Sequence, residues 1–319
     1  MGYKLAGCNV IGDLEIDPRM NNVYVENFHP KYNFCEDIRD FNKREDLPKE
    51  LYDLDILDAS PPCSTFSMCG KRDKDWGKSK KFREGQKEQT LDDLFFVTIE
   101  TINKLRPKVA IMENVEGLIK GTAWKYVQEI YKRLSNIGYS VKHWLIKCED
   151  AGVPQKRHRV FFIATRLDFN LDKVDLKFDY QPILFSEIKE GIGRSPTEKQ
   201  KLLLDNVLPN ETLLANAHKR IFGKKGWFSH VLCYDNKVMP TIPAGHDCMW
   251  RFPEKVHCSN EDIRNGSTFP IDYNFLNQDV AYICGMSVPP VMMKRVVTRL
   301  IQSGIFNYKL KGCDRDGDK

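Results

Sequence analysis

The chain contains the stretch Asp55-Ile56-Leu57-Asp58-Ala59-Ser60-Pro61-Pro62-Cys63-Ser64, in which a short apolar strand runs directly into a rigid turn. Proline fixes its own φ angle and restricts the residue before it, so Pro61 and Pro62 end the strand and hold Cys63 in one direction. A cysteine becomes a strong nucleophile where nearby positive charge or a helix start favours its ionised form. The stretch therefore predicts a strand that presents a nucleophile at its carboxyl end.

Two later segments carry groups that suit the same chemistry. An apolar strand over residues 109–115 ends in Glu113-Asn114-Val115, and Gln155-Lys156-Arg157-His158-Arg159 leads into the apolar run Val160-Phe161-Phe162-Ile163. Because side chains alternate along a strand, Arg157 and Arg159 point to one side and His158 to the other. Desolvation at the end of an apolar strand favours a protonated Glu113, which could hold or donate a proton. A thiol, an acid and fixed positive charge together indicate attack on a heterocyclic ring.

Each of these groups also has a structural alternative. Cys63 could be a small buried apolar side chain, which is the usual state of a free cysteine. Glu113 could simply cap the segment that follows its strand, and the two arginines could be a basic pair on the surface at the start of a strand. The order of the three segments favours a site, while the other nine cysteines keep the structural interpretation.

The periodicity of the first half predicts alternating helices and strands. Apolar spacing indicates helices over residues 88–105 and 124–134, and strands over 139–146 and 160–165. Alternation of this kind is typical of an α/β fold with a largely parallel sheet covered by helices. Ligands of such sheets gather at the carboxyl ends of the strands, where Cys63 and Glu113 fall.

The pattern changes after Arg166, which predicts a second, smaller domain. Residues 168–260 mix short apolar runs with proline, glycine, asparagine and aromatic residues and show no clean periodicity. A helix recovers within 279–305 and is expected to return to the first domain. We therefore predict a discontinuous domain over 1–180 and 277–319, interrupted by a smaller domain over 181–276.

Composition limits the class of protein. The 319 residues are 41% hydrophobic and 29% charged, with no apolar run long enough to span a membrane, which is typical of a cytoplasmic globular protein. Ten cysteines occur without a Cys-x-x-Cys pair, so we expect reduced thiols and no metal. The net charge is +5, and residues 71–87 alone hold eight basic and three acidic side chains. A basic loop directly after Cys63 suits a polyanionic substrate such as DNA, although a solvated loop is the alternative.

The order Pro-Pro-Cys, Glu-Asn-Val, Gln-x-Arg-x-Arg resembles that of the DNA cytosine-5 methyltransferase family, from about Gly7 to about Leu300. The resemblance implies a Rossmann-like S-adenosylmethionine-dependent methyltransferase sheet, with an irregular target-recognition domain at 181–276. It also implies transfer of a methyl group to C5 of a cytosine that is flipped out of a specific duplex site, through a bond between Cys63 and C6. In this scheme Glu113 acts at N3, Arg159 reaches O2, Arg157 supports the loop and backbone, and loop 64–87 closes over the base.

The resemblance also assigns a binding site for S-adenosylmethionine, with no metal. Glu15 would bind the ribose hydroxyls and Ile16 would lie against the adenine, while Asp37 and Ile38 would contact the adenine amino group and ring. The remaining pocket residues would be Pro62, Leu94, Ser287 and Val288.

The chain departs from the family in its first cofactor motif. The first strand and its Phe-x-Gly-x-Gly turn should lie about 20 residues before Glu15, but only fourteen residues precede it here. Gly191-Ile192-Gly193 follows no strand and is not that motif, and Gly285-Met286-Ser287 stands where the family has Gly-Asn-Ser or Gly-Asn-Ala. Either Met1 is an internal methionine with a segment upstream, or the gene is truncated or split.

The expected partner is double-stranded DNA, in a prokaryotic or phage-encoded restriction-modification or protective enzyme that acts as a monomer at the nucleoid. A cognate restriction endonuclease could belong to the same system without a required contact. Phosphate contacts are expected from Lys219, Arg220, Lys224 and Lys225, and base contacts from residues 226–236. Two alternatives remain: a truncated, catalytically weak DNA-binding remnant, and a transfer RNA cytosine-5 methyltransferase, whose usual Cys-Phe-Thr element does not occur in the chain.

Overall fold

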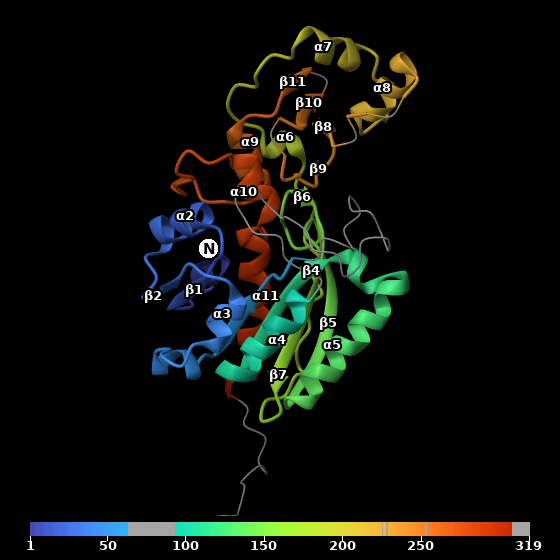
Figure 1. Ribbon diagram of the computed structural model, residues 1–319. Coiled ribbons are helices and arrows are strands. Elements are labelled where there is room, and N and C mark those ends of the chain that lie inside the picture. The colour runs from blue at the N-terminus through green and yellow to red at the C-terminus, as the bar shows by residue number, and fades with distance from the viewer. Residues whose placement is uncertain (63–92, 225, 228, 246, 253, 308–319) are drawn as a thin grey trace, which may run out of the picture.

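The computed structural model describes residues 1–62, 93–224, 226–227, 229–245, 247–252 and 254–307 (Figure 1). Its largest sheet is formed by β3 (Ile56–Ala59), β4 (Val109–Val115), β5 (Tyr139–Lys147) and β7 (His158–Arg166). The strands lie in the order β3-β4-β7-β5, so the predicted strands of the first half are all present.

The direction of β7 corrects the prediction of a largely parallel sheet. β3 and β4 are parallel, but β7 runs antiparallel to both β4 and β5. A parallel return requires a crossover, usually a helix, and the segment between Lys147 and His158 contains none. The chain therefore turns back at this edge of the sheet.

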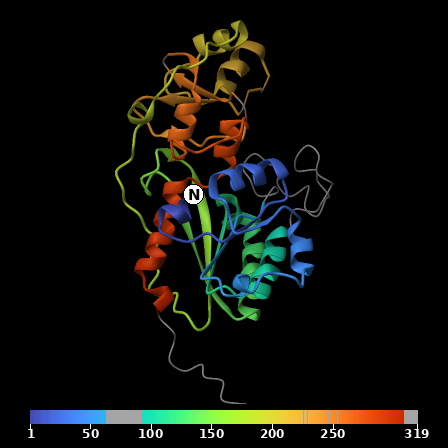
Figure 2. The same cartoon turned by 90° about the vertical axis from the view of Figure 1, so that its left-hand side faces the viewer.

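Helices cover both faces of the sheet, as Figure 2 shows from the side. Alternate residues of β4 face opposite ways: Val109 and Ile111 pack against α11 (Pro290–Gln302), while Ala110 and Met112 pack against α4 (Leu94–Leu105) and α5 (Trp124–Asn136). These four residues of β4 are fully buried, as expected for an apolar strand covered on both faces.

A second, two-stranded sheet precedes the larger one in the chain. It pairs β1 (Gly12–Leu14) in parallel with β2 (Tyr32–Phe34), and α2 (Pro18–Phe28) connects the two strands. α1 (Gly2–Leu5) lies before β1 and packs on α11, so closely that a Cβ at Gly2 would overlap Cβ of Met293. α3 (Ile38–Lys43) follows β2 and is capped by Asp37.

A smaller sheet in the order β11-β10-β8 lies at one end of the molecule (Figure 1). Its strands are β8 (Val231–Tyr234), β10 (Met249–Phe252) and β11 (Val256–His257), and the helices around it are α6 (Phe185–Ile188), α7 (Glu198–Asp205), α8 (Leu214–Phe222) and α9 (Asn260–Gly266). Trp250 is fully buried in a separate apolar cluster beside this sheet.

Short elements connect these parts. β6 (Gln155–Lys156) pairs in parallel with β9 (Met239–Pro240), which joins the segment before β7 to the smaller sheet. The remaining elements are α10 (Val280–Met286) and the short 3-10 helices η1 (Lys49–Tyr52), η2 (Glu116–Ile119), η3 (Gly121–Ala123) and η4 (Ile305–Asn307). Within the described residues, we find no helix with the length and apolar character needed to cross a membrane.

Candidate active site

Glu113 lies near the end of the most deeply buried strand of the large sheet. It follows Met112 on β4, and only 9% of the residue is exposed. Because side chains alternate, Glu113 faces the same side as Val109 and Ile111, which is the side covered by α11. The apolar run that forms the strand therefore also carries a carboxylate into the interior.

Arg159 supplies the positive charge that this buried carboxylate requires. Its Nε lies 2.9 Å from Oε1 of Glu113, and both side chains are largely buried. Arg159 stands opposite Val115 in the antiparallel register of β4 and β7, so the two strands bring the pair together from positions 46 residues apart in sequence. A charge-assisted hydrogen bond in this setting fixes the direction of both side chains.

Arg157 occupies a deeper position on the same side. It is 3% exposed, and its Nη1 donates a hydrogen bond of 3.0 Å to the carbonyl of Gly285 at the end of α10. Burial lowers the pKa of Arg157 to about 10, and the neighbouring charge of Arg159 acts in the same direction. The guanidinium thus stays protonated at neutral pH and ties the start of β7 to α10.

Asn114 connects the ends of β3 and β4, a role that was not predicted from the sequence. Its Nδ2 donates 3.1 Å to the carbonyl of Pro61, and its Oδ1 accepts 2.9 Å from the backbone N–H of Val115. The Pro-Pro turn is thereby held beside Glu113. The position of asparagine directly after the acid was the available signal, but its partner could not be known before the fold.

Cys63 and loop 64–87 lie outside the described residues. Their predicted roles therefore remain predictions. The described chain reaches Pro62, three residues beyond the alanine that ends β3 and one residue before the cysteine in sequence.

His158 faces the other way from the two arginines, as the alternation predicts. Its Nε2 lies 3.1 Å from Oε1 of Glu149, and its Nδ1 lies 3.5 Å from Oε2 of Glu116. These contacts tie β7 to the segments around it.

The residues predicted to bind the adenosine half of a cofactor follow the two parallel strands β1 and β2. Glu15 comes directly after β1, and its carboxylate accepts 2.8 Å from the backbone N–H of Asp17. Ile16 is 38% exposed, which is unusual for its type and suits contact with a flat ligand. Asp37 and Ile38 stand where α3 begins after β2, so all four predicted residues share the carboxyl edge of this sheet.

Arg39 connects the residues after β2 to the start of α4, where the predicted pocket residue Leu94 lies. It forms ion pairs with Asp37 at 3.5 Å and with Asp93 at 2.8 Å. Asp93 immediately precedes Leu94, so the starts of α3 and α4 lie side by side. Arg39 was not among the residues predicted from the sequence to form the site.

Ser287 and Val288 lie between α10 and α11. The Ser287 hydroxyl donates 2.7 Å to the carbonyl of Ile283, and Val288 packs against the apolar cluster beneath α11. Neither of these two contacts involves Glu15 or Asp37.

The fit of S-adenosylmethionine to these residues is partial. An acid after a strand and an exposed Ile16 suit a ribose and an adenine, as in other nucleotide sites at sheet edges. The two sheets nevertheless remain separate in the described residues, so the edge that carries Glu15 is not continuous with the edge that carries Pro62. No cluster of potential metal ligands occurs within the described ranges.

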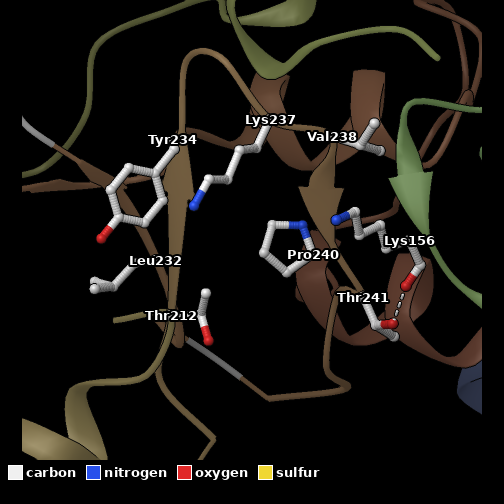
Figure 3. Close-up of a pocket in the computed structure, with 8 residues that line it drawn as sticks. All are labelled: Lys156, Thr212, Leu232, Tyr234, Lys237, Val238, Pro240 and Thr241. Atoms are coloured by element: carbon white, nitrogen blue, oxygen red, sulfur yellow. Dashed lines mark hydrogen bonds between the residues drawn. The ribbon is translucent and has the colours of Figure 1, made fainter. Parts of the chain in front are cut away.

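A hollow of about 290 Å³ lies away from Glu113, where β6 and β9 meet the smaller sheet (Figure 3). Lys156 and Lys237 both line it, together with Tyr234, and the Thr241 hydroxyl donates to the Lys156 carbonyl. Since Lys156 directly precedes Arg157, the hollow adjoins the candidate site along the chain. The positive charge of its two lysines suits a polyanion.

Comparisons with known proteins identify the family. The C-5 cytosine-specific DNA methylase family matches residues 1–238. The chain is 33% identical to the type II methyltransferase M.DdeI of Desulfomicrobium norvegicum over 54% of this chain and 39% of that protein. It is 30% identical to M.HaeII of Haemophilus aegyptius over 69% of this chain and 58% of that protein. The chain thus spans about half the length of these curated relatives.

Solved structures agree on the fold. A candidate DNA modification methyltransferase encoded within an E. coli prophage matches with a TM-score of 0.66 and 18% identity, over 96% of this chain and 95% of that one. A mutant of Spodoptera frugiperda DNMT2 matches with a TM-score of 0.63 and 17% identity, over 94% and 95%. The predicted α/β methyltransferase fold is confirmed by these likenesses. Because the family match covers most of the sequence, the chain belongs to the C-5 cytosine-specific DNA methylase family.

Proposed function

We propose that the protein is a DNA cytosine-5 methyltransferase, which transfers a methyl group from S-adenosylmethionine to a cytosine in duplex DNA. The observation that carries the proposal is the Glu113–Arg159 pair at the end of β4, tied through Asn114 to the turn that leads to Cys63. An acid and a cation at a fixed separation, next in sequence to a cysteine turn, suit addition to a pyrimidine ring. The family match supports the same chemistry.

In the proposed mechanism the chain's own residues activate the ring. The Cys63 thiolate forms a bond to C6, and the electron pair displaced from the C5–C6 bond moves toward N3 and O2. Glu113 holds a proton at N3 while Arg159 donates to O2. These two contacts stabilise the negative charge that develops on N3 and O2 as the thiolate adds. C5 thereby becomes nucleophilic; bound S-adenosylmethionine supplies the methyl group. Loss of the C5 proton to a base and release of Cys63 then restore the ring.

The target base must leave the duplex, because a stacked cytosine cannot reach a group as buried as Glu113. We propose that the smaller sheet and its helices, within residues 181–276, bind the DNA site, and that residues 1–180 and 277–319 carry the chemistry. The separate apolar cluster around Trp250 supports an independent recognition unit. Among the predicted phosphate contacts, Lys219 and Lys224 are exposed, whereas Arg220 is already paired with Glu211, and Lys225 lies outside the described residues.

The similarity to type II methyltransferases supports a role in a restriction-modification system. We propose that the enzyme acts as a monomer on DNA at the nucleoid and requires no contact with a nuclease. Methylation of a short site by itself would protect that site from cleavage.

The decisive experiment separates the ring chemistry from the donor. Duplex DNA tritiated at cytosine C5 should release tritium to water without any donor, because reversible addition of Cys63 lets C5 exchange its proton. The Cys63→Ser variant should abolish the release. A second arm measures transfer of a labelled methyl group from S-adenosylmethionine to DNA and, in parallel, to transfer RNA. Exchange that survives in Cys63→Ser would overturn the mechanism, and transfer to RNA alone would favour the RNA enzyme.

A further inference from the structure

Two free thiols meet in the smaller sheet. Cys233 lies on β8, and Cys258 comes directly after β11. Their sulfur atoms are 3.7 Å apart, although the two residues are separated by 25 positions in sequence. Cys233 is fully buried, whereas Cys258 is partly exposed. The fold therefore brings two sulfur donors into contact and leaves one of them open to solvent.

The pair lies across β10, the central strand of this sheet (Figure 1). Cys233 stands opposite Arg251 on one side of β10. On the other side the backbone N–H of Cys258 donates 3.0 Å to the carbonyl of Met249, which continues the antiparallel pairing of β10 with β11. Residues two apart on a strand face the same way, so Met249, Arg251 and the two cysteines share one face of the sheet. The two cysteine side chains thus approach each other over the backbone of β10.

This position disfavours a direct bond between the two sulfurs. Because β10 separates β8 from β11, the backbones of the outer strands lie two strand spacings apart, which is about 9 Å. A disulfide joins Cα atoms that are at most roughly 7 Å apart. Oxidation to a disulfide would therefore require β11 to leave its place beside β10, whereas a single atom between the sulfurs requires no such movement.

The separation of the sulfurs suits one metal ion held by both of them. Two thiolates that each lie about 2.3 Å from a tetrahedral ion are about 3.8 Å apart. The sulfurs of Cys233 and Cys258 already have this spacing. A linear S–metal–S arrangement would need them to separate by about 1 Å more, which rotation about the side-chain torsions can supply.

The surroundings of the pair favour a soft ion. Cys233, Met239 and Met249 belong to one apolar cluster, and Cys258 packs against it. Thiolate and thioether donors select Cu(I), whereas hard cations prefer oxygen. Structural zinc takes four ligands, and the part of the chain that the structure describes contains no group of three or more carboxylate, imidazole and thiol ligands. Two thiols in an apolar setting thus suit Cu(I), which accepts two or three soft ligands.

We propose that Cys233 and Cys258 form a binding site for one Cu(I) ion, which bridges their sulfur atoms. Each thiol gives up its proton as its sulfur bonds to copper, so one ion displaces two protons and the oxidation state of copper does not change. The ion enters from the side of Cys258, because Cys233 has no exposed surface. The inference goes beyond the proposed function and does not depend on it.

The release of protons makes copper binding dependent on pH. The contact with Cys233 and burial raise the pKa of the Cys258 thiol well above its usual value; Asp262 on α9 adds to the rise, and Arg251 on β10 opposes it. This thiol therefore keeps its proton at neutral pH until a metal displaces it. Because two protons leave for each ion, the affinity for Cu(I) should rise with pH, by up to about 100-fold per pH unit.

A competition titration of the whole chain tests the proposal. The probe is Cu(I) buffered by bathocuproine disulfonate, with ascorbate to keep the copper reduced, and the colour of the chelator complex fades as the protein removes the metal. One ion per chain should lose about 100-fold or more in affinity in Cys258→Ser and in Cys233→Ala, because a second sulfur held in place acts at a high effective concentration. Cys284→Ala is the matched control, since it removes another buried thiol of the same cluster and should keep the ion.

Thermal unfolding gives a second readout. Cu(I) should raise Tm of the parent chain by about 3 °C or more and should leave Tm of both cysteine variants unchanged. Unfolding curves without copper show whether each variant folds, and Cys258→Ser, which replaces one sulfur at a partly exposed position, serves if Cys233→Ala does not fold.

Three results would overturn the proposal. The first is an equal Cu(I) affinity of the parent chain and Cys258→Ser, and the second is a Zn(II) affinity of this pair as high as that for Cu(I). The third is a Cys233–Cys258 disulfide that glutathione disulfide forms in the folded chain, identified by mass spectrometry. None of these measurements requires methyl transfer, so their outcome is separate from that of the catalytic test.

Discussion

At the scale of single residues, the site depends on a carboxylate that the strand order carries into the protein. Glu113 lies at the end of an apolar run whose other members are fully buried, and Arg159 is its ion-pair partner at 2.9 Å. A buried charge is tolerated when it is paired and hydrogen-bonded, and the pair then fixes where each group points. Because its position is fixed in this way, Glu113 is a better candidate for the catalytic acid than an exposed carboxylate of the chain.

We expect Glu113→Gln to lower the rate of tritium release from cytosine C5 by about 100-fold or more, because the amide cannot hold the N3 proton as an acid. The side-chain shape is kept, so the thermal midpoint should move little. Glu116→Gln is the matched control, since Glu116 pairs with Lys120 and His158 outside the proposed ring contacts. A rate for Glu113→Gln equal to that of the control would remove Glu113 from the mechanism.

Asn114 should act as a positioning residue rather than a catalytic one. Asn114→Ala leaves the buried Pro61 carbonyl without its donor, which should cost about 1–3 kcal/mol of unfolding free energy. The tritium-release rate should fall with an unchanged pH profile, because the ring contacts themselves remain. Asn206→Ala removes a comparable bond on the surface, to the Leu202 carbonyl, and should leave both quantities nearly unchanged. Urea unfolding and the rate of tritium release, both measured on the two variants, test whether Asn114 acts by positioning.

At the scale of elements, an ion pair holds the smaller sheet to the helix beside it. Arg251 of β10 reaches Asp262 of α9 with two bonds, of 2.7 and 3.0 Å, and Asp262 is fully buried. The carboxylate also accepts from the backbone N–H groups of Ser259 and Glu190. One acid therefore caps its own helix and joins three segments of the chain.

Asp262→Ala should lower the unfolding free energy by about 3–5 kcal/mol, because it leaves a buried guanidinium without its partner. Asp205→Ala, which removes an exposed carboxylate paired with Lys255, should have little effect and serves as the control. Chemical denaturation followed by intrinsic tryptophan fluorescence, compared between the two variants, measures the change in unfolding free energy. A small effect of Asp262→Ala would mean that the sheet is stabilised mainly by its apolar cluster.

Asp58 on β3 should give the protein a measurable pH dependence. The Asp58 residue is exposed at the surface of β3, yet desolvation by the surrounding chain raises the pKa of its carboxyl to about 6, so the folded state binds a proton more tightly than the unfolded state does. Stability contributed by this group is therefore present below the unfolded pKa of about 4 and is lost as pH rises to about 6. Asp58→Asn should flatten this part of the curve of unfolding free energy against pH. Asp55→Asn, whose carboxylate pairs with Lys108 on the surface, should leave the slope as it is; equal slopes in all three proteins would contradict the assignment.

At the scale of the whole molecule, the charge distribution should govern DNA affinity. With a net charge of +5 and lysines at the hollow beside β6, binding should weaken by about tenfold or more between about 50 and 200 mM salt. Lys156→Gln and Lys237→Gln should each reduce the slope of log affinity against log salt by about one. Lys142→Gln, on β5 and paired with Asp172, should leave the slope unchanged. Fluorescence anisotropy of a labelled duplex over a salt series provides the comparison.

The order of the motifs was enough to predict the family, the main strands and a set of candidate site groups that includes one acid and two arginines. Residues 109–112 are all apolar, and only a strand covered on both faces accommodates them, so the buried position of Glu113 followed from local sequence. The end of α4 at Leu105, before Arg106-Pro107, was equally predictable, since proline disfavours helix at the residue before it. Cys63 remains a sequence prediction, because its position lies outside the described residues.

What the sequence by itself determined was the set of chemical groups and the elements that carry them, because strand and helix patterns are local. Only the tertiary structure decided the antiparallel direction of β7, the ion pair of Glu113 with Arg159 and the bond from Asn114 to Pro61. It also showed that, among the described residues, β1 pairs with β2 and β3 with β4 in two separate sheets. Each of these features depends on how strands that are distant in sequence pair with one another. The register of that pairing is set by packing of the whole layer rather than by any short stretch of chain.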